Sequence, residues 1–289
     1  MAMKKVFLCV GGDARQTYTA GTLAGYGKVY AYGIDIEKNS AIRTENLDSM
    51  EEKADVLVLP MMKKDGLKIE CSDGKNVCCT ELVPHLKKGA LVLGGRMGIK
   101  LIEFFSALGY DVADYFNREE LVIRNCIPTA EGTLQIAMQE TGKVIFNMPV
   151  LVTGYGRVAK AVAKLFRAVG AKVSVSARRL SALAEAENDG MNVFSLEEMY
   201  GHIPAFSVIV NTVPSMIFDE GMLEAVSKNT VIIDLASKPG GVDFSSAEKL
   251  NRRVIHALAL PAKSAPVTSG EIIARTVINI ILERGTINV

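Results

Sequence analysis

The sequence predicts an α/β protein made of two Rossmann-like units, each a doubly wound parallel sheet, with a cleft between the units. Apolar runs of strand length alternate with helical patterns along the chain, and this alternation is typical of parallel sheets. Each half opens on an apolar run that ends in a glycine-rich turn, at Gly11–Gln16 and at Gly154–Ala159. A helical pattern over 127–139 separates the halves, and we interpret it as a connecting helix.

At 289 residues the chain is long enough for two domains. We expect an N-terminal substrate domain over 1–126, completed by a C-terminal helix over 270–289, and a linker helix plus dinucleotide-binding domain over 127–269. The formal net charge is +1, from 33 basic and 32 acidic residues, so no nucleic-acid partner is expected. No apolar run reaches the roughly 20 residues of a membrane span. The five cysteines lack zinc-site spacing, so we expect reduced thiols, no metal and a cytoplasmic protein.

The most specific pattern follows the apolar run 149–153. It reads G-Y-G-R-V-A, opens a helical pattern and is followed by a second apolar run over 172–176. Gly154 permits the tight turn, and Gly156 lets a pyrophosphate approach the backbone at the helix N-terminus, where N–H groups are free. The alternative is a merely structural glycine turn. The turn residues that we assign to the cofactor are Gly154, Tyr155, Gly156, Arg157 and Val158.

The end of the run 172–176 indicates which dinucleotide binds. NAD sites usually place an acid there to hold the ribose 2′-hydroxyl. This chain has Ser176, Arg178 and Arg179 and no carboxylate, and guanidinium groups suit a 2′-phosphate. We therefore predict NADP with these three residues in its site. The alternative is that the arginines are solvated residues at a strand end.

Two later apolar runs, over 207–210 and 230–233, also end in small polar residues. The carboxyl ends of parallel strands share one edge of the sheet, so we expect the following loops to reach the nicotinamide half of the cofactor. The residues assigned to the cofactor there are Asn211, Thr212, Val213, Pro214, Leu235 and Ala236. Ser237, in the second loop, is assigned to the catalytic group.

The first glycine-rich turn reads G-G-D-A-R-Q, which is not the dinucleotide pattern, although Asp35 follows at a fitting distance along the chain. Arg15 and Gln16 occupy the helix start, and such groups suit a substrate carboxylate. Arg96 follows the apolar run 90–94, so it is expected on the same rim as Arg15. Both arginines can bind carboxylates bidentately. The alternative is that they are ordinary surface or capping arginines.

The remaining candidates lie on the connecting helix and in the last loops. Thr129 and Glu131 stand at the expected helix start, where capping is slightly favoured over a role in the cleft. Residues 260–270 are expected to form a loop. On it Lys263 is a candidate for a carboxylate contact, as is Lys238 in the preceding loop. The candidate catalytic residues are Arg15, Arg96, Ser237 and Lys263.

No side chain is an obvious general base, since the three histidines sit in no recognisable motif. The residues alone indicate an NADP-dependent oxidoreductase of a small acid. One alternative is an NAD(P)-dependent 2-hydroxyacid or amino-acid dehydrogenase, although the cleft His with an acidic partner expected of the former is not found. Another is a regulatory protein that senses NADP without turnover.

Several motifs occur in a fixed order over nearly the whole chain. They are G-G-D-A-R-Q at Gly11, P-T-A-E-G at Pro128, G-Y-G-R at Gly154, N-T-V-P-S-M at Asn211, D-L-A-S-K-P-G-G-V-D at Asp234 and A-P-V-T-S-G at Ala265. Together they resemble the family formed by the A subunits of dipicolinate synthase from spore-forming bacteria. The chain departs from that family at Ala259 and Ala262, where the family tends to have glycines.

The resemblance implies a two-domain Rossmann-type fold, NADP as cofactor and, as partner, the flavoprotein-like B subunit of dipicolinate synthase. Family members convert 4-hydroxy-tetrahydrodipicolinate to dipicolinate in the mother cell during sporulation. Loss of water is implied to give a dihydropyridine, and hydride transfer to NADP⁺ then aromatises the ring. The two carboxylates of such a substrate would give Arg15 and Arg96 a purpose. We also expect a homo-oligomer.

Overall fold

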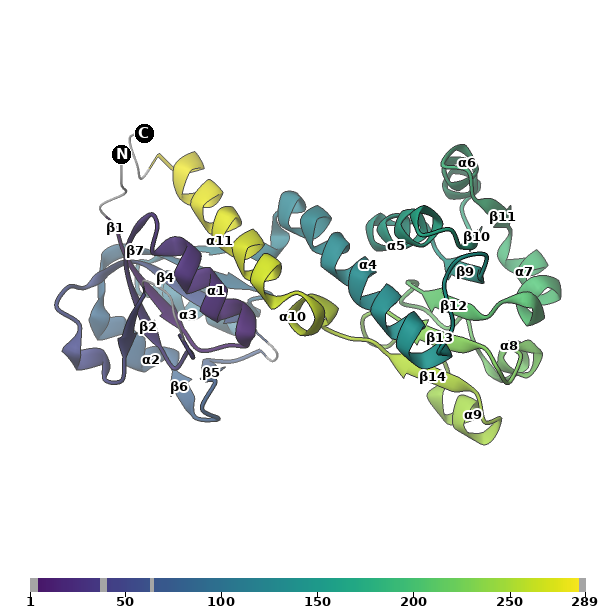
Figure 1. Cartoon of the computed structure of the whole chain (residues 1–289). Helices are drawn as coiled ribbons and strands as arrows, with labels where there is room; N and C mark the ends of the chain where they lie inside the picture. Colours follow the sequence, from purple (N-terminus) through teal and green to yellow (C-terminus); the bar gives the residue numbers. More distant parts are fainter. Residues whose placement is uncertain (1–4, 37–40, 63–64, 286–289) are drawn as a thin grey trace. The chain divides into compact units, whose positions relative to one another are not determined.

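The computed structural model of the chain describes residues 5–36, 41–62 and 65–285 (Figure 1). It divides into two compact units. Unit 1 runs to Asn125 and resumes at Ala265, whereas unit 2 covers Cys126–Ser264. Each unit holds a six-stranded parallel sheet, so the predicted α/β class with two Rossmann-like sheets is confirmed.

The sheet of unit 1 has the strand order β3-β2-β1-β4-β7-β8. Its strands are β1 (Lys5–Val10), β2 (Gly27–Tyr32), β3 (Ile42–Thr44), β4 (Ala54–Met61), β7 (Leu86–Gly95) and β8 (Asp111–Asp114). Its helices are α1 (Ala14–Leu23), α2 (Cys79–Leu82), α3 (Ile99–Ala107) and α11 (Pro266–Glu283). A separate antiparallel hairpin is formed by β5 (Lys68–Glu70) and β6 (Asn76–Cys78).

Both faces of this sheet are buried, which explains why its central strands read as continuous apolar runs. Phe7 and Cys9 of β1 pack in one cluster with residues of α1 and α11, including Ile273. The alternate residues of β1, such as Leu8, pack in a second cluster with Phe105 of α3. Successive side chains of a strand point to opposite faces of the sheet, so each strand contributes to two hydrophobic cores, one on each face.

The sheet of unit 2 has the equivalent order β11-β10-β9-β12-β13-β14. Its strands are β9 (Pro149–Thr153), β10 (Lys172–Ser176), β11 (Asn192–Phe194), β12 (Val208–Asn211), β13 (Val231–Asp234) and β14 (Arg253–His256). Its helices are α5 (Arg157–Ala168), α6 (Leu180–Asn188), α7 (Leu196–His202), α8 (Glu220–Ala225), α9 (Phe244–Lys249) and α10 (Leu260–Ser264). Helix α4 (Glu119–Thr141) begins in unit 1 and ends in unit 2.

The expected start of the connecting helix is wrong. Helix α4 begins at Glu119, so Thr129 and Glu131 lie in its interior and cannot cap it. Pro128, which looked like a helix start, sits inside the helix. Proline lacks the N–H that would donate to the carbonyl of Arg124, four residues earlier, yet the helix continues through it to Thr141.

The expected loop over 260–270 is also wrong, because it contains α10 and the first turn of α11. Pro266 is at the start of α11, where a missing N–H costs nothing. Gly270 lies within the helix because it touches α1: a Cβ there would stand 2.5 Å from the Arg15 carbonyl oxygen. This glycine marks a close helix–helix approach and not a helix end.

Candidate functional site

The glycine turn after β9 has the geometry that a pyrophosphate requires. Gly154 has a φ of +86°, and a Cβ there would stand 2.8 Å from the Thr212 hydroxyl. Above Gly156 a Cβ would meet nothing within 4 Å, so the space over this backbone is open. Helix α5 then begins with no side-chain cap. Its first N–H groups and its positive dipole end are therefore suited to phosphate oxygens.

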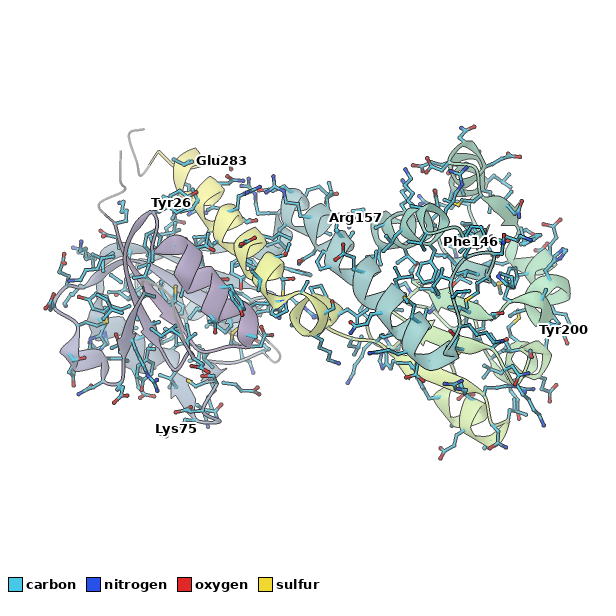
Figure 2. All side chains as sticks on the ribbon, viewed as in Figure 1. Tyr26, Lys75, Phe146, Arg157, Tyr200 and Glu283 are labelled. Atoms are coloured by element: carbon cyan, nitrogen blue, oxygen red, sulfur yellow. The ribbon has the colours of Figure 1, made fainter. Side chains whose placement is uncertain are left out.

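Other residues of this turn support the backbone. Tyr155 is 3% exposed, and its hydroxyl donates to Asp189 at 2.7 Å. Burial and the nearby carboxylate raise the pKa of Tyr155, so it stays a neutral donor. Val158 packs against the core, whereas Arg157 is exposed on the first turn of α5 (Figure 2). The backbone of Tyr155 and the side chain of Arg157 are the parts that can face a ligand.

The end of β10 carries the residues predicted to read the 2′-position. Ser176 is fully buried, and its hydroxyl donates to the Ser195 carbonyl at 3.2 Å. Arg178 and Arg179 are exposed, and within the described part of the chain neither guanidinium is engaged by a hydrogen bond or an ion pair. Both side chains are thus open to an anion, while Ser176 fixes the strand end.

A buried polar network joins the carboxyl ends of three adjacent strands of unit 2, β9, β12 and β13. The Thr153 hydroxyl donates to Asn211 Oδ1 at 2.6 Å, and Asn211 Nδ2 donates to Asp234 Oδ1 at 2.8 Å. All three side chains are 0% exposed. The side chain predicted to contact the cofactor, Asn211, is therefore turned into the protein. Its own loop is held by Val213, whose N–H donates to Asn211 Oδ1 and whose carbonyl accepts from Asn211 Nδ2.

The same network holds the loop after β13. Asp234 accepts hydrogen bonds from the N–H groups of Ala236 and Gly241, at 3.1 and 3.2 Å. A Cβ on Gly241 would stand 2.6 Å from the Val213 carbonyl, so the two loops touch at this glycine. Leu235 is half-buried, and Ser237 and Lys238 are exposed.

Sequence reasoning missed Thr153, Asp234 and Gly241 as supports of the site. The available signal was a polar residue at the last position of an otherwise apolar strand, seen at Thr153, Asn211 and Asp234. Of the other residues assigned to the site, Pro214 and Lys263 are exposed, Thr212 and Val213 are half-buried, and Ala236 is buried.

In unit 1, Arg15 is largely withdrawn from solvent. It is 9% exposed, and its Nε and Nη2 donate to the two carboxylate oxygens of Asp13 at 2.9 and 2.7 Å. Nη1 lies 3.0 Å from the sulfur of Met61. Asp13 also caps α1 through the N–H of Arg15. Most of the binding capacity of this guanidinium is thus used within the protein.

Arg96 differs from Arg15 in its exposure and in its partners. It follows β7 and its side chain is exposed, with the guanidinium carbon 5.8 Å from the centre of the Phe116 ring. Its backbone has a φ of +53°, in the left-handed region. Since β1 and β7 both flank β4, Arg15 and Arg96 follow the carboxyl ends of strands on the same edge of the sheet, as predicted.

Unit 1 also contains cavities around the hairpin β5–β6. One of about 440 Å³ is lined by Asp13, Met61, Asp65, Lys68 and Glu70 among others. A second, of about 680 Å³, borders Asp35 and Cys71. Of the described acidic residues in the first wall, Asp13 is already paired with Arg15.

Within residues 5–36, 41–62 and 65–285, none of the helices combines the length and apolar character needed to cross a bilayer. No group of three or more His, Cys, Asp or Glu side chains in the same ranges is arranged to hold a metal ion.

Comparison with known proteins identifies the two halves of the chain. The family model of the N-terminal domain of the dipicolinate synthase A subunit matches residues 6–116. That of the D-isomer specific 2-hydroxyacid dehydrogenase, NAD binding domain, matches residues 128–260. Unit 2 is therefore a dehydrogenase domain for a nicotinamide dinucleotide, and the chain is an oxidoreductase.

Similarity extends over the full length. The dipicolinate synthase A subunit of Bacillus subtilis (strain 168) is 31% identical over 282 residues, which are 95% of this chain and 95% of that protein. The crystal structure of the A subunit from Bacillus halodurans matches with a TM-score of 0.86 at 30% identity, over 97% of this chain and 99% of that one. The crystal structure from Bacillus subtilis matches with a TM-score of 0.84 at 29% identity, over 99% and 98%. The chain belongs to the family of dipicolinate synthase A subunits.

Proposed function

We propose that this chain is an NADP-dependent dehydrogenase that oxidises dihydrodipicolinate, formed from 4-hydroxy-tetrahydrodipicolinate, to dipicolinate. The observation that carries the proposal is the 31% identity with a dipicolinate synthase A subunit, across 95% of both chains. When bound, the cofactor would accept a hydride from the dihydropyridine ring, and a proton lost from the ring completes aromatisation. Because aromatisation favours the product, positioning matters more than a strong base.

The residues of unit 2 divide the work of holding this cofactor. The open backbone at Gly156 and the uncapped start of α5 would hold the pyrophosphate. Arg178 and Arg179 would hold the 2′-phosphate, since they are exposed and no carboxylate competes at the end of β10. The loops fixed by Asp234 would border the nicotinamide, with Ser237 beside them.

In unit 1 the cationic group that would meet a substrate carboxylate is Arg96, which is exposed, whereas the guanidinium of Arg15 is already paired with Asp13. We also propose that the chain acts with the B subunit of dipicolinate synthase and as a homo-oligomer in a sporulating cell. The relative from Bacillus subtilis is named as one subunit of its enzyme, which supports the existence of a partner chain.

Turnover tests the proposal directly. The chain is mixed with 4-hydroxy-tetrahydrodipicolinate and NADP⁺, and NADPH is followed at 340 nm, with and without the B subunit. Growth of absorbance when the two chains are present together, with dipicolinate as product, supports the proposal. Oxidation of 2-hydroxy or amino acids in its place would favour the alternative dehydrogenases. NADP binding with no turnover of any of these substrates would favour a sensor.

The preference for NADP has its own test. Reversing one charge, Arg178→Asp, should lower the affinity for NADP about 10- to 100-fold and the affinity for NAD much less. The reason is that a charged hydrogen bond to phosphate contributes about 1.5–3 kcal/mol. Lys172→Asp is the matched control, since Lys172 is an exposed cation at the opposite end of the same strand. Equal losses for NAD and NADP in Arg178→Asp would show that this arginine does not read the phosphate.

A further inference from the structure

The two arginines on the carboxyl edge of the sheet in unit 1 are not equivalent. Arg15 has both carboxylate oxygens of Asp13 as partners and is 9% exposed. The guanidinium of Arg96 is exposed and, among the residues that the structure describes, forms no hydrogen bond or ion pair. Only Arg96 can therefore offer a full bidentate face to an incoming carboxylate.

The backbone of Arg96 is strained. A φ of +53° is rare for a side chain as large as arginine, and such a conformation persists only where its surroundings impose it. The neighbouring glycines restrict the turn, since a Cβ on Gly95 would stand 2.5 Å from the Tyr115 ring and a Cβ on Gly94 would stand 2.5 Å from the sulfur of Met97. The turn is thus packed into one conformation.

Asp114 is the group that imposes this conformation. One carboxylate oxygen accepts the N–H of Arg96 at 3.0 Å and that of Phe116 at 2.7 Å. The other accepts the N–H of Met97 at 2.7 Å. The carboxylate at the end of β8 therefore fastens the strained turn after β7 and also holds the residue whose ring lies beside the Arg96 guanidinium.

We infer that Arg96 is the residue that binds a carboxylate of the substrate dianion, and that Asp114 is a positioning residue that holds Arg96 for this contact. Arg15 is then a structural partner of Asp13. This inference rests on the proposed function, because it takes a pyridine dicarboxylate as the ligand.

The first test separates strain from ligand binding. Glycine relieves a left-handed backbone, so Arg96→Gly should raise Tm and at the same time weaken dipicolinate about 10- to 100-fold, measured by titration calorimetry on the full chain. Asn251→Gly is the control, since Asn251 has a φ of +52° after α9. That variant should leave dipicolinate binding unchanged. Binding that survives in both Arg96→Gly and Arg96→Ala would overturn the inference.

The second test asks whether Asp114 acts through Arg96. Asp114→Ala should weaken dipicolinate several-fold and Asp114→Asn less, since asparagine keeps one acceptor oxygen. The double variant Arg96→Ala with Asp114→Ala should bind no more weakly than Arg96→Ala alone. Fully additive losses would show that Asp114 has only a general structural role.

Measuring NADPH affinity distinguishes a wrong assignment of Arg96 and Asp114 from a wrong proposed function. All variants in unit 1 should bind NADPH as the unaltered chain does. If the unaltered chain binds NADPH but no dipicolinate, the proposed substrate is wrong. If it binds dipicolinate and Arg96 variants do too, the substrate stands and the inference about Arg96 falls.

Discussion

Burial decides which cysteine side chains of this protein can react. Cys9 and Cys79 are fully buried, and burial raises the pKa of each thiol to about 12. The thiolate is the reactive form, so at pH 8 the thiol of Cys9 stays protonated and unreactive. Cys78 is half-buried and borders solvent.

We expect iodoacetamide at pH 8 to modify Cys78 well before Cys9 and Cys79, as followed by mass spectrometry of peptides. Because a raised pKa favours the protonated thiol, moving from pH 7 to pH 9 should still leave the two buried thiols largely unmodified. In concentrated guanidinium chloride all sites should react at similar rates. Native-state labelling of Cys9 as fast as that of Cys78 would contradict this assignment.

Removing Arg15 should act on stability more than on ligand binding. Its side chain is 10% exposed and paired with Asp13, whose side chain is 40% exposed. Arg15→Ala leaves that carboxylate without its bidentate partner and should cost about 1–3 kcal/mol, measured as a lowered Tm. Arg15→Lys should recover part of the loss, since lysine keeps the charge without the fork. An unchanged Tm in Arg15→Ala would contradict this role, and NADP affinity should survive in both variants.

At the scale of elements, the loops after β12 and β13 behave as one body. Asp234 holds the β13 loop directly and holds the β12 loop through Asn211. A methyl group on Gly241 would collide with the Asn211 amide and approach the Val213 carbonyl to 2.6 Å. Any side chain at position 241 must therefore move both loops together.

Gly241→Ala should consequently lower the affinity for NADPH about tenfold or more, measured by NADPH fluorescence. The chain should stay folded, as measured by circular dichroism. Gly201→Ala is the matched control, since a Cβ there meets nothing within 4 Å and alanine favours the helix. The control should bind NADPH normally and be slightly more stable. Normal NADPH binding by Gly241→Ala would mean that these loops do not border the cofactor.

Helices and strands whose bounds depend on the local sequence pattern were predicted correctly. Those whose bounds depend on contacts with distant parts of the chain were not. The strand, glycine turn and helix from Pro149 to Ala168 follow from apolar period and glycine placement within one short stretch. Gly270 was wrongly predicted to lie in a loop, because the glycine is required by a contact with α1. Thr19 of α1, 251 positions away in the sequence, donates a hydrogen bond to the Gly270 carbonyl. Pro128 misled because a proline signals a helix start far more often than a helix interior.

The site shows the same division. The residue types at Gly154, Gly156 and Arg178 predicted an open turn and an exposed cation. These features depend on the local backbone and on solvent exposure and not on a distant partner. The roles of Asn211 and Arg15 depend on partners, Asp234 and Asp13, that take up their polar groups. Spacing along the chain cannot reveal whether a polar side chain is already hydrogen-bonded to another side chain in the folded protein.

At the scale of the whole molecule, two sheets of the same strand order have different capacities for a nucleotide. The turns begin alike: Gly11 N–H donates to the carbonyl of Tyr32 at 2.9 Å, and Gly154 N–H donates to that of Ser176 at 2.8 Å. Beyond this they diverge. Gly12 N–H is used by the Glu70 carbonyl of the hairpin at 2.7 Å.

The space above the first turn is also filled. A Cβ on Gly12 would stand 2.6 Å from Pro60 and 2.7 Å from Gln16, whereas the space above Gly156 is open. Helix α1 is capped by the carboxylate of Asp13, which would repel a phosphate at the position where α5 has no side-chain cap. The hairpin and Asp13 together close unit 1 to a dinucleotide.

We therefore expect one NADPH per chain, bound by unit 2 alone. Titration calorimetry with NADPH should give a stoichiometry close to one, and Gly156→Asp should abolish binding because it places a carboxylate in the open space above the turn that begins α5. Replacing Asp13 with Asn should not create a second site, since the Glu70 carbonyl would still occupy Gly12 N–H. A stoichiometry of two, or NADPH binding that persists in Gly156→Asp, would mean that unit 1 accepts the nucleotide despite its capped helix and covered glycines.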